Sequence, residues 1–203
     1  LDYAKKYTDS PFLVKLEKEG DHYKPARLLR ANELAEHKDI SNGDWKFVNI
    51  DESDGSLVIP KGSMGQRWDK EPGKWNMKHE DTVNDKPYDP LLSLLDSHDE
   101  VLQAEFTEWG LDQTVLRGVP AKMIDSVDGP VPVTTVYDLM MAQYGVSRDL
   151  EGEYPADYTD KDQAYTPAWQ EVFTSVDSKT VLQFAREWAD TANITEGKCM
   201  IIV

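Results

Sequence analysis

The sequence predicts a mixed α/β (α+β) fold with helical ends and a central β-rich region. Short apolar alternations separated by turn residues are concentrated between residues 39 and 135, which is typical of strands. Helical periodicity takes over at Val136 and returns between residues 178 and 189. A last apolar run, residues 199–203, follows that helix, so the chain is expected to close on a helix–strand unit.

Residues 1–38 are predicted to be mostly helical. The first helix should end near Asp9, because the residue before Pro11 avoids the helical conformation. Lys24-Pro25 is expected to form a turn. A short helix is expected at residues 31–35, with Asn32 as a candidate N-cap.

Residues 39–135 are predicted to form a β-rich irregular insertion. Residues 45–50 and 56–59 should pair as a hairpin around the turn cluster Asp51-Glu52-Ser53-Asp54-Gly55. Asp128-Gly129-Pro130 is expected to form another turn. Residues 62–98 are expected to be irregular. Further short strands are predicted at residues 101–106, 115–119, 121–124 and 131–135.

Residues 136–203 form the predicted α/β part. A helix should run from Val136 to Tyr144, with Gly145 as its C-cap, and an acidic loop should follow at residues 149–163. Asp177 or Ser178 should cap the last helix. That helix has an apolar stripe of Val181, Leu182, Ala185, Trp188 and Ala189.

The final apolar run is typical of a strand buried on both faces, and native chains seldom end inside such a strand. We therefore expect residues 1–203 to be a single internal fragment of a larger protein. Ligands of α/β proteins bind beyond the carboxyl ends of parallel strands, so chemistry is expected after Val203.

The formal net charge of −16 disfavours nucleic acid and anionic lipid as partners, because both require a basic surface. No apolar run reaches 18 residues, so direct membrane insertion is not expected. The single cysteine, Cys199, excludes an internal disulfide and a cysteine-based metal cage. It is expected to be a small buried hydrophobic residue.

The candidate metal ligands are weakly patterned. None of the four histidines lies three to five residues from another, so surface positions are favoured over a metal site. Two carboxylate clusters, Asp51–Gly55 and residues 157–162, are interpreted as solvated turns rather than weak calcium sites, because neither has the EF-hand spacing. The histidines are His22, His37, His79 and His98.

The segment Gly62-Ser63-Met64-Gly65 lacks the length and the Gly-Lys-Ser/Thr ending of a phosphate loop. It also lacks the Gly-x-Ser-x-Gly pattern of a nucleophile elbow. Arg67, Trp68 and Trp75 offer cation–π stacking on a ligand, although packing over a thin core is favoured.

Three further polar residues, Asp9, Arg27 and Arg30, lie within apolar patterns. Such groups are usually satisfied by neighbours, but in a cleft the arginines would hold an anion. The residues alone therefore indicate no catalytic constellation and no metal-ligand set.

The segment Lys6-Tyr7-Thr8-Asp9-Ser10-Pro11-Phe12-Leu13-Val14 resembles the Tyr-Thr-Asp-x-Pro-x-Leu-Val segment of molybdopterin oxidoreductases of the dimethyl sulfoxide reductase family. Within that family the order of motifs resembles the catalytic alpha subunits of membrane-bound respiratory nitrate reductases, and residues 80–90 and 107–116 match least well. The other motifs are Arg27–Ala31, Gly73–Asn76, Leu92–Leu95, Val133–Leu139, Tyr165–Trp169 and Ala185–Asp190.

This resemblance implies a much longer parent subunit that carries a molybdenum bis(molybdopterin guanine dinucleotide) cofactor and a [4Fe–4S] cluster. The parent would reduce nitrate to nitrite by oxygen-atom transfer at molybdenum. It implies electrons from quinol, passed through an iron–sulfur beta subunit and a membrane haem gamma subunit. It also implies a location at the cytoplasmic face of the cell membrane.

The resemblance further implies that the cluster ligands and the molybdenum-ligating aspartate precede Leu1, and that a cofactor loop follows Val203. We therefore expect no catalytic residue, metal ligand or bound cofactor in this chain, which alone should be inactive. Which residues contact the cofactor is left open. Asp9 is expected to face the substrate funnel of the complete subunit.

Two alternatives remain at this point. A chlorate, selenate or hydrocarbon-oxidising relative shares the Tyr-Thr-Asp-x-Pro segment, but Gly73–Asn76 and Val133–Leu139 favour nitrate reductase. A stand-alone acidic interaction module is the other, and it requires Val203 to be a natural terminus.

Overall fold

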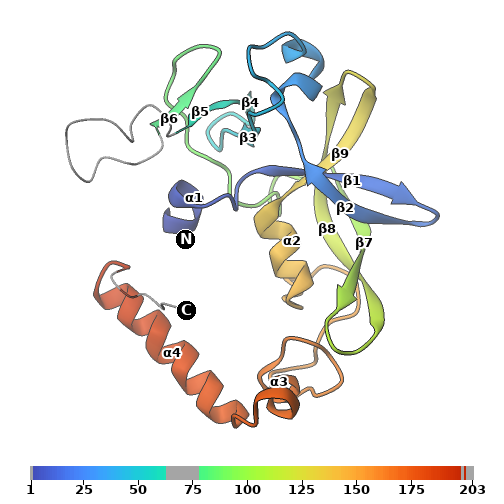
Figure 1. Ribbon diagram of the computed structural model, residues 1–203, viewed down its shortest axis with the longest axis vertical. Helices are drawn as coiled ribbons and strands as arrows, with labels where there is room; N and C mark the ends of the chain where they lie inside the picture. The colour runs from blue at the N-terminus through green and yellow to red at the C-terminus, as the bar shows by residue number, and fades with distance from the viewer. Residues whose placement is uncertain (1, 63–77, 198, 200–203) are drawn as a thin grey trace.

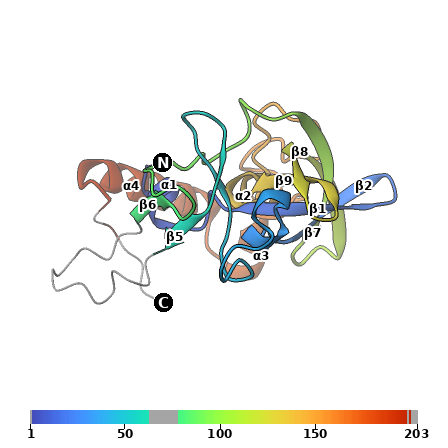
Figure 2. The ribbon, with the colours of Figure 1, turned by 90° about the horizontal axis from the view of Figure 1, so that it is seen from above.

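The computed structural model describes residues 2–62, 78–197 and 199. Its centre is a closed barrel of five strands in the order β1-β2-β7-β8-β9. Figures 1 and 2 show the barrel on one side of the molecule and the long helix α4 (Ser178–Ile194) extending away from it. The mixed α+β class is confirmed. The barrel strands are β1 (Leu13–Glu19), β2 (His22–Leu28), β7 (Glu100–Glu108), β8 (Gln113–Ser126) and β9 (Gly129–Thr135).

The predicted helical character of residues 1–38 is wrong for most of this segment. Helix α1 covers only Asp2–Tyr7, and it ends before Pro11 as expected. Strands β1 and β2 then form an antiparallel hairpin in which Glu19 lies opposite His22. The two-residue turn Gly20-Asp21 joins them, and Gly20 adopts φ +66°, which glycine reaches without a steric penalty.

The expected turn at Lys24-Pro25 is also wrong. Pro25 lies inside β2, opposite Leu16, next to a register shift between the two strands. Proline lacks a backbone donor, and within sheets it is found where pairing is irregular. β2 joins β7 only through the parallel pair Tyr23 and Ala104, so regular pairing is sparse on this side of the barrel.

The expected short helix at residues 31–35 consists of two 3₁₀ turns, η1 (Ala31–Glu33) and η2 (Ala35–His37). Arg30, rather than Asn32, occupies the N-cap position of η1. The Glu33 carboxylate accepts a hydrogen bond from the Arg30 backbone N–H at 2.9 Å. An acidic side chain therefore satisfies a donor at the start of the turn, as in a capping box.

The predicted hairpin around Asp51–Gly55 is confirmed, although its strands are short: β3 (Asn49–Ile50) pairs with β4 (Leu57–Val58). A second two-stranded sheet, β5 (Pro60–Gly62) with β6 (Lys78–Asp81), was not predicted. The two strands predicted at residues 115–119 and 121–124 are parts of the single strand β8. A turn joins β8 to β9 close to the predicted position, but its two residues are Val127 and Asp128, and Gly129 and Pro130 already belong to β9.

Buried apolar residues of the described part form three clusters. In the first, Leu139 and Ala142 of α2 (Val136–Gln143) pack with Phe106 and Val119 of the barrel strands. The second surrounds Leu13 and includes residues of the β3–β4 hairpin, and the third joins Leu16, Leu102 and Ala121 of β1, β7 and β8. The barrel contains strands from both sides of residue 39. The division of the chain into units at residues 39 and 135 stays a prediction.

The C-terminal helices have the caps that their sequences indicate. Thr166 caps α3 (Pro167–Thr174), and Asp177, one of the two predicted caps, accepts hydrogen bonds from the backbone N–H groups of Lys179 and Thr180. Helix α4 packs against α3 and has no buried residue. Its predicted apolar stripe is therefore at most half-buried.

Of the predicted final strand, only Cys199 belongs to the described residues; it is half-buried, and its Sγ lies 4.0 Å from the Trp188 carbonyl oxygen. Residues 198 and 200–203 lie outside the described part. Among residues 2–62, 78–197 and 199, no helix has the length and hydropathy needed to cross a bilayer.

Candidate functional site

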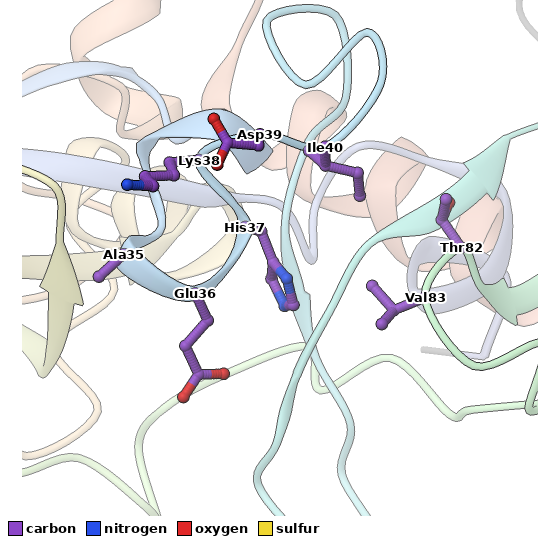
Figure 3. A pocket seen from close by; sticks show the side chains of 8 residues that line it. All are labelled: Ala35, Glu36, His37, Lys38, Asp39, Ile40, Thr82 and Val83. Carbon is purple, nitrogen blue, oxygen red and sulfur yellow. The ribbon is translucent and has the colours of Figure 1, made fainter.

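Two hollows lie on either side of η2, and Ala35, Glu36 and His37 line both. One hollow has a volume of about 300 Å³ and continues to Thr82 and Val83. The other has a volume of about 400 Å³ and lies against β4 and the second half of β8. Figure 3 shows His37 and Ile40 directed toward Val83 across the first hollow, whereas Lys38 points away from it.

Apolar, polar and charged side chains line these hollows, and they do not form a catalytic arrangement. Within the described part of the chain, no hydrogen bond joins His37 to a carboxylate or hydroxyl group. The Thr82 hydroxyl is buried and lacks a hydrogen-bond partner among the described residues. General acid–base catalysis requires a positioned acid or base within hydrogen-bond reach of the group it serves. We therefore assign no catalytic role to either hollow.

Two of the other histidines, His22 and His98, lie close to polar groups of the described residues. The His22 ring lies 3.2 Å from an Asp21 oxygen and 3.5 Å from a Glu105 oxygen. His98 donates through Nδ1 to the Leu95 carbonyl oxygen at 2.8 Å. Among the described residues, no group of three or more His, Cys, Asp or Glu side chains is placed to hold a metal ion.

His79 differs from these, because its ring packs against an aromatic side chain and it is half-buried. Its ring packs edge-on against Tyr88 with ring centroids 5.8 Å apart. Burial lowers the pKa of His79 below its ordinary value, and burial also raises the pKa of Tyr88 to about 12. Both shifts favour the neutral side chain, so this pair is suited to packing rather than to holding charge.

The first carboxylate cluster organises its own turn. Asp51 accepts a hydrogen bond from the Ser53 backbone N–H at 3.0 Å, and Asp54 accepts one from the Ser56 N–H at 2.9 Å. Glu52 instead forms an ion pair with Lys5. The hydrogen bonds of Asp51 and Asp54 are side chain–backbone bonds of the Asx-turn type, and they stabilise the loop between β3 and β4.

The second carboxylate cluster behaves in the same way. Asp157 accepts from both the backbone N–H and the hydroxyl of Thr159 at 2.6 Å. Asp160 accepts from the backbone N–H groups of Ala156 and Asp162. Hydrogen bonds from Thr159 lower the pKa of the Asp157 carboxyl group, so it is ionised at neutral pH.

The polar residues singled out near the N-terminus are only partly brought together. Arg27 Nη2 lies 2.9 Å from Glu33 Oε1, and Arg30 stacks over the Phe47 ring at 4.2 Å from its centroid. Asp9 is exposed between α1 and β1, where its backbone carbonyl accepts from the Phe12 N–H. Most of Gly62–Gly65, together with Arg67, Trp68 and Trp75, lies outside the described residues.

Sequence reasoning missed the buried Arg117 of β8, which has more side-chain hydrogen bonds than any other residue in the part of the chain that the structure describes. Its guanidinium donates to the backbone carbonyls of Ala142, Gln143 and Glu153 and to the side chains of Glu108 and Gln163. It thereby satisfies carbonyls at the C-terminal end of α2, where a positive charge is favourable. An arginine inside the apolar run from Val115 to Val119 was the available signal.

A second buried network, also missed, surrounds Asp138 in the first turn of α2. Its carboxylate accepts hydrogen bonds from the Ser93 hydroxyl, the Leu94 N–H, the Thr135 hydroxyl and Arg148 Nη1, at 2.6–2.9 Å. These four donors, one of which is the Arg148 cation, compensate the cost of burying the carboxylate. The spacing Thr135-x-x-Asp138 at the start of a predicted helix was the available signal.

The chain is similar to nitrate reductase alpha chains from several bacteria. The chain is 39% identical over 215 residues to the respiratory nitrate reductase 1 alpha chain of Escherichia coli K12, and 38% identical over 205 residues to the nitrate reductase alpha chain of Bacillus subtilis 168. It is 39% identical over 214 residues to the nitrate reductase alpha subunit of Mycobacterium tuberculosis CDC 1551. No protein-family model matches the chain.

Each of these matches includes the whole chain, but the chain spans only 16–17% of the length of these relatives. The resemblance inferred from the ordered motifs is therefore confirmed, and it extends beyond the residues on which it was based. The similarity concerns one segment of much longer polypeptides.

Proposed function

We propose that this chain, which belongs to the nitrate reductase alpha-chain family, is a central segment of the catalytic subunit of a respiratory nitrate reductase. The observation that carries the proposal is identity of 36–39% along essentially the whole chain to nitrate reductase alpha chains from several bacteria. The complete enzyme would reduce nitrate to nitrite, a two-electron oxygen-atom transfer, with electrons from quinol. The segment alone is proposed to be inactive.

The proposed cofactors are a molybdenum bis(molybdopterin guanine dinucleotide) and a [4Fe–4S] cluster in the complete subunit. A [4Fe–4S] cluster is held by four cysteine thiolates, and the sequence has a single cysteine, Cys199, so these 203 residues do not supply its ligand set. We propose that residues elsewhere in the complete subunit ligate both groups, and which residues of this segment contact the molybdenum cofactor is left open. No reaction step is assigned to a side chain of this segment.

We propose that the segment acts as a rigid structural support in the complete subunit. The Arg117 and Asp138 networks fix both ends of α2 to the barrel with buried, charge-assisted hydrogen bonds. Catalytic sites need supporting residues that are locked in place, because small displacements at a reacting centre cost rate. Asp9, exposed next to the barrel, is the one residue proposed to face the substrate funnel.

The proposed partners are an iron–sulfur beta subunit and a membrane haem gamma subunit, at the cytoplasmic face of the cell membrane. The names of the relatives support this in part, because an alpha chain implies other chains. The described segment contributes no membrane-spanning helix.

The substrate is tested with the complete assembly, reduced by an artificial electron donor, with nitrate, chlorate and selenate as competing acceptors. A nitrate reductase has its highest kcat/KM for nitrate. A higher kcat/KM for chlorate or selenate would transfer the segment to a related oxyanion reductase, the second candidate function. Reading the gene beyond Val203 tests the stand-alone interaction module, because that alternative requires a stop codon there.

A further inference from the structure

A pocket lined by tyrosines lies between the end of α2 and the acidic loop of residues 149–163. Its volume is about 210 Å³, and its lining includes Tyr144, Tyr158 and Tyr165, two prolines and Asp157. This volume is below the range of about 300–1,000 Å³ that is typical of small-molecule sites. The pocket is therefore of a size for one side chain rather than for a substrate.

Hydrogen bonds and ring contacts hold two of the tyrosines that line this pocket. The Tyr165 hydroxyl accepts hydrogen bonds from the Trp109 backbone N–H and from the Gln143 side chain, each at 3.3 Å. The Tyr165 ring packs edge-on against Tyr144 with centroids 5.1 Å apart, and Gly145 brings the chain against Pro155. Two of the three tyrosines are thus held in place before any ligand arrives.

The loop that forms the rim is strongly acidic. Residues 149–163 contain six carboxylates and one lysine, which gives a net charge of −5. Asp157 belongs to the pocket lining itself. Its Oδ1 accepts both bonds from Thr159, and within the described part of the chain no hydrogen bond reaches its Oδ2. A negative oxygen at a tyrosine-lined opening is suited to a cation.

We propose that this pocket receives a lysine or arginine side chain presented by another polypeptide of the assembly. Aromatic rings attract ammonium and guanidinium groups through their electron-rich faces, and a carboxylate at the rim adds a direct charge partner. The acidic rim disfavours nucleic acid and anionic lipid as occupants. An apolar or proline-rich segment would use the rings but leave the acidic rim without a function.

The inference rests on the proposed function in one respect, because it assumes that the alpha chain works together with other chains. Tyr158, which is 61% exposed, is the residue to label. In the complete assembly it is replaced by the photo-reactive p-benzoylphenylalanine, and the adduct is identified by mass spectrometry. We expect one major adduct, on a lysine- or arginine-containing peptide of another subunit. The same label at Trp45, which is 80% exposed and does not line the pocket, should not give that adduct.

The role of charge is tested with a second substitution in the labelled protein. Asp157→Asn should lower the yield of the adduct by about fivefold or more, because the charge partner of the cation is lost. Asp162→Asn is the matched control, since Asp162 lies in the same loop but does not line the pocket, and it should leave the yield nearly unchanged.

The proposal is overturned by no adduct, by an adduct on an acidic or neutral peptide, by one within the alpha chain itself, or by equal yields in the two aspartate variants. The adduct is measured without any turnover. An assembly that forms it but does not reduce nitrate would refute the proposed function and leave this inference standing.

Discussion

The Arg117 guanidinium and the Glu108 carboxylate form an ion pair at 2.8 Å, and both side chains are fully buried. Glu108 lies on β7 and Arg117 on the antiparallel neighbour β8. Arg117 also donates to the Ala142 carbonyl, so the ion pair connects the barrel to the C-terminal end of α2. Glu108 also accepts a hydrogen bond from Gln113 at 2.7 Å. A buried ion pair of this kind is costly to break, because the remaining charge is left without compensation.

The first prediction concerns Arg117. Arg117→Met should lower the free energy of unfolding by about 3–5 kcal/mol, because it leaves the buried Glu108 carboxylate without its cation and removes a donor from three carbonyls. The double variant Arg117→Met/Glu108→Leu should be less destabilised than Arg117→Met, since the unpaired carboxylate is removed as well. Urea denaturation followed by circular dichroism measures both. A cost below about 1 kcal/mol for Arg117→Met would show that the network is not needed for stability.

The second prediction concerns Gly145, which follows α2. It adopts φ +75°, and an added Cβ would lie 2.7 Å from Pro155 Cδ. Gly145→Ala should therefore cost about 2–4 kcal/mol, from backbone strain and from steric overlap. Gly20→Ala is the control, because Gly20 has φ +66° with no atom within 4 Å, so only the backbone term of about 1 kcal/mol remains. Equal losses of stability in the two variants would contradict the close contact with Pro155.

The third prediction concerns pH. Burial lowers the pKa of His79, so the folded state favours its neutral form. The stabilisation is present above the ordinary histidine pKa of about 6.5, and it is lost as the pH falls through the lowered value. His79→Phe should keep the ring contact with Tyr88 and flatten the decline of the urea midpoint between about pH 7 and 5. The exposed His98, changed to Gln, is the control and should leave that decline unchanged.

The fourth prediction concerns Asp9 in the complete enzyme. A carboxylate beside the path of an anion repels it, so Asp9→Asn should lower the KM for nitrate by roughly two- to fivefold at low ionic strength. The difference should shrink in high salt, because exposed charges are screened. Steady-state nitrate kinetics at two salt concentrations measure this. Unchanged kcat and KM at both concentrations would remove Asp9 from the substrate funnel.

The sequence predicted the fold most reliably where the signals are local. The β8–β9 turn, the β3–β4 hairpin, the cap at Asp177 and the left-handed Gly145, one residue after the C-cap Tyr144 of α2, all follow from residues within a few positions of one another. The β1–β2 hairpin was missed although Gly20-Asp21 is a two-residue turn signal, because the adjacent apolar residues Phe12, Leu13 and Val14 suit a helix as well as a strand.

Long-range features were harder to predict. The barrel closes through contacts between β1 and β9, which no local pattern specifies. Arg117 has partners as far away as Gln163, 46 residues along the chain, and only the folded structure brings them together. The family was nevertheless recognisable, because the order of short motifs persists where their structural role is not apparent from the residues alone.

The most direct test of the central claim is nitrite formation by a purified assembly whose alpha subunit contains this chain. With a reduced electron donor and nitrate, we expect one nitrite for each pair of electrons consumed, as two-electron oxygen-atom transfer requires. The isolated 203-residue chain under the same conditions should form none. An intact assembly, loaded with its cofactors, that consumes electrons with other acceptors but forms no nitrite from nitrate would contradict the claim.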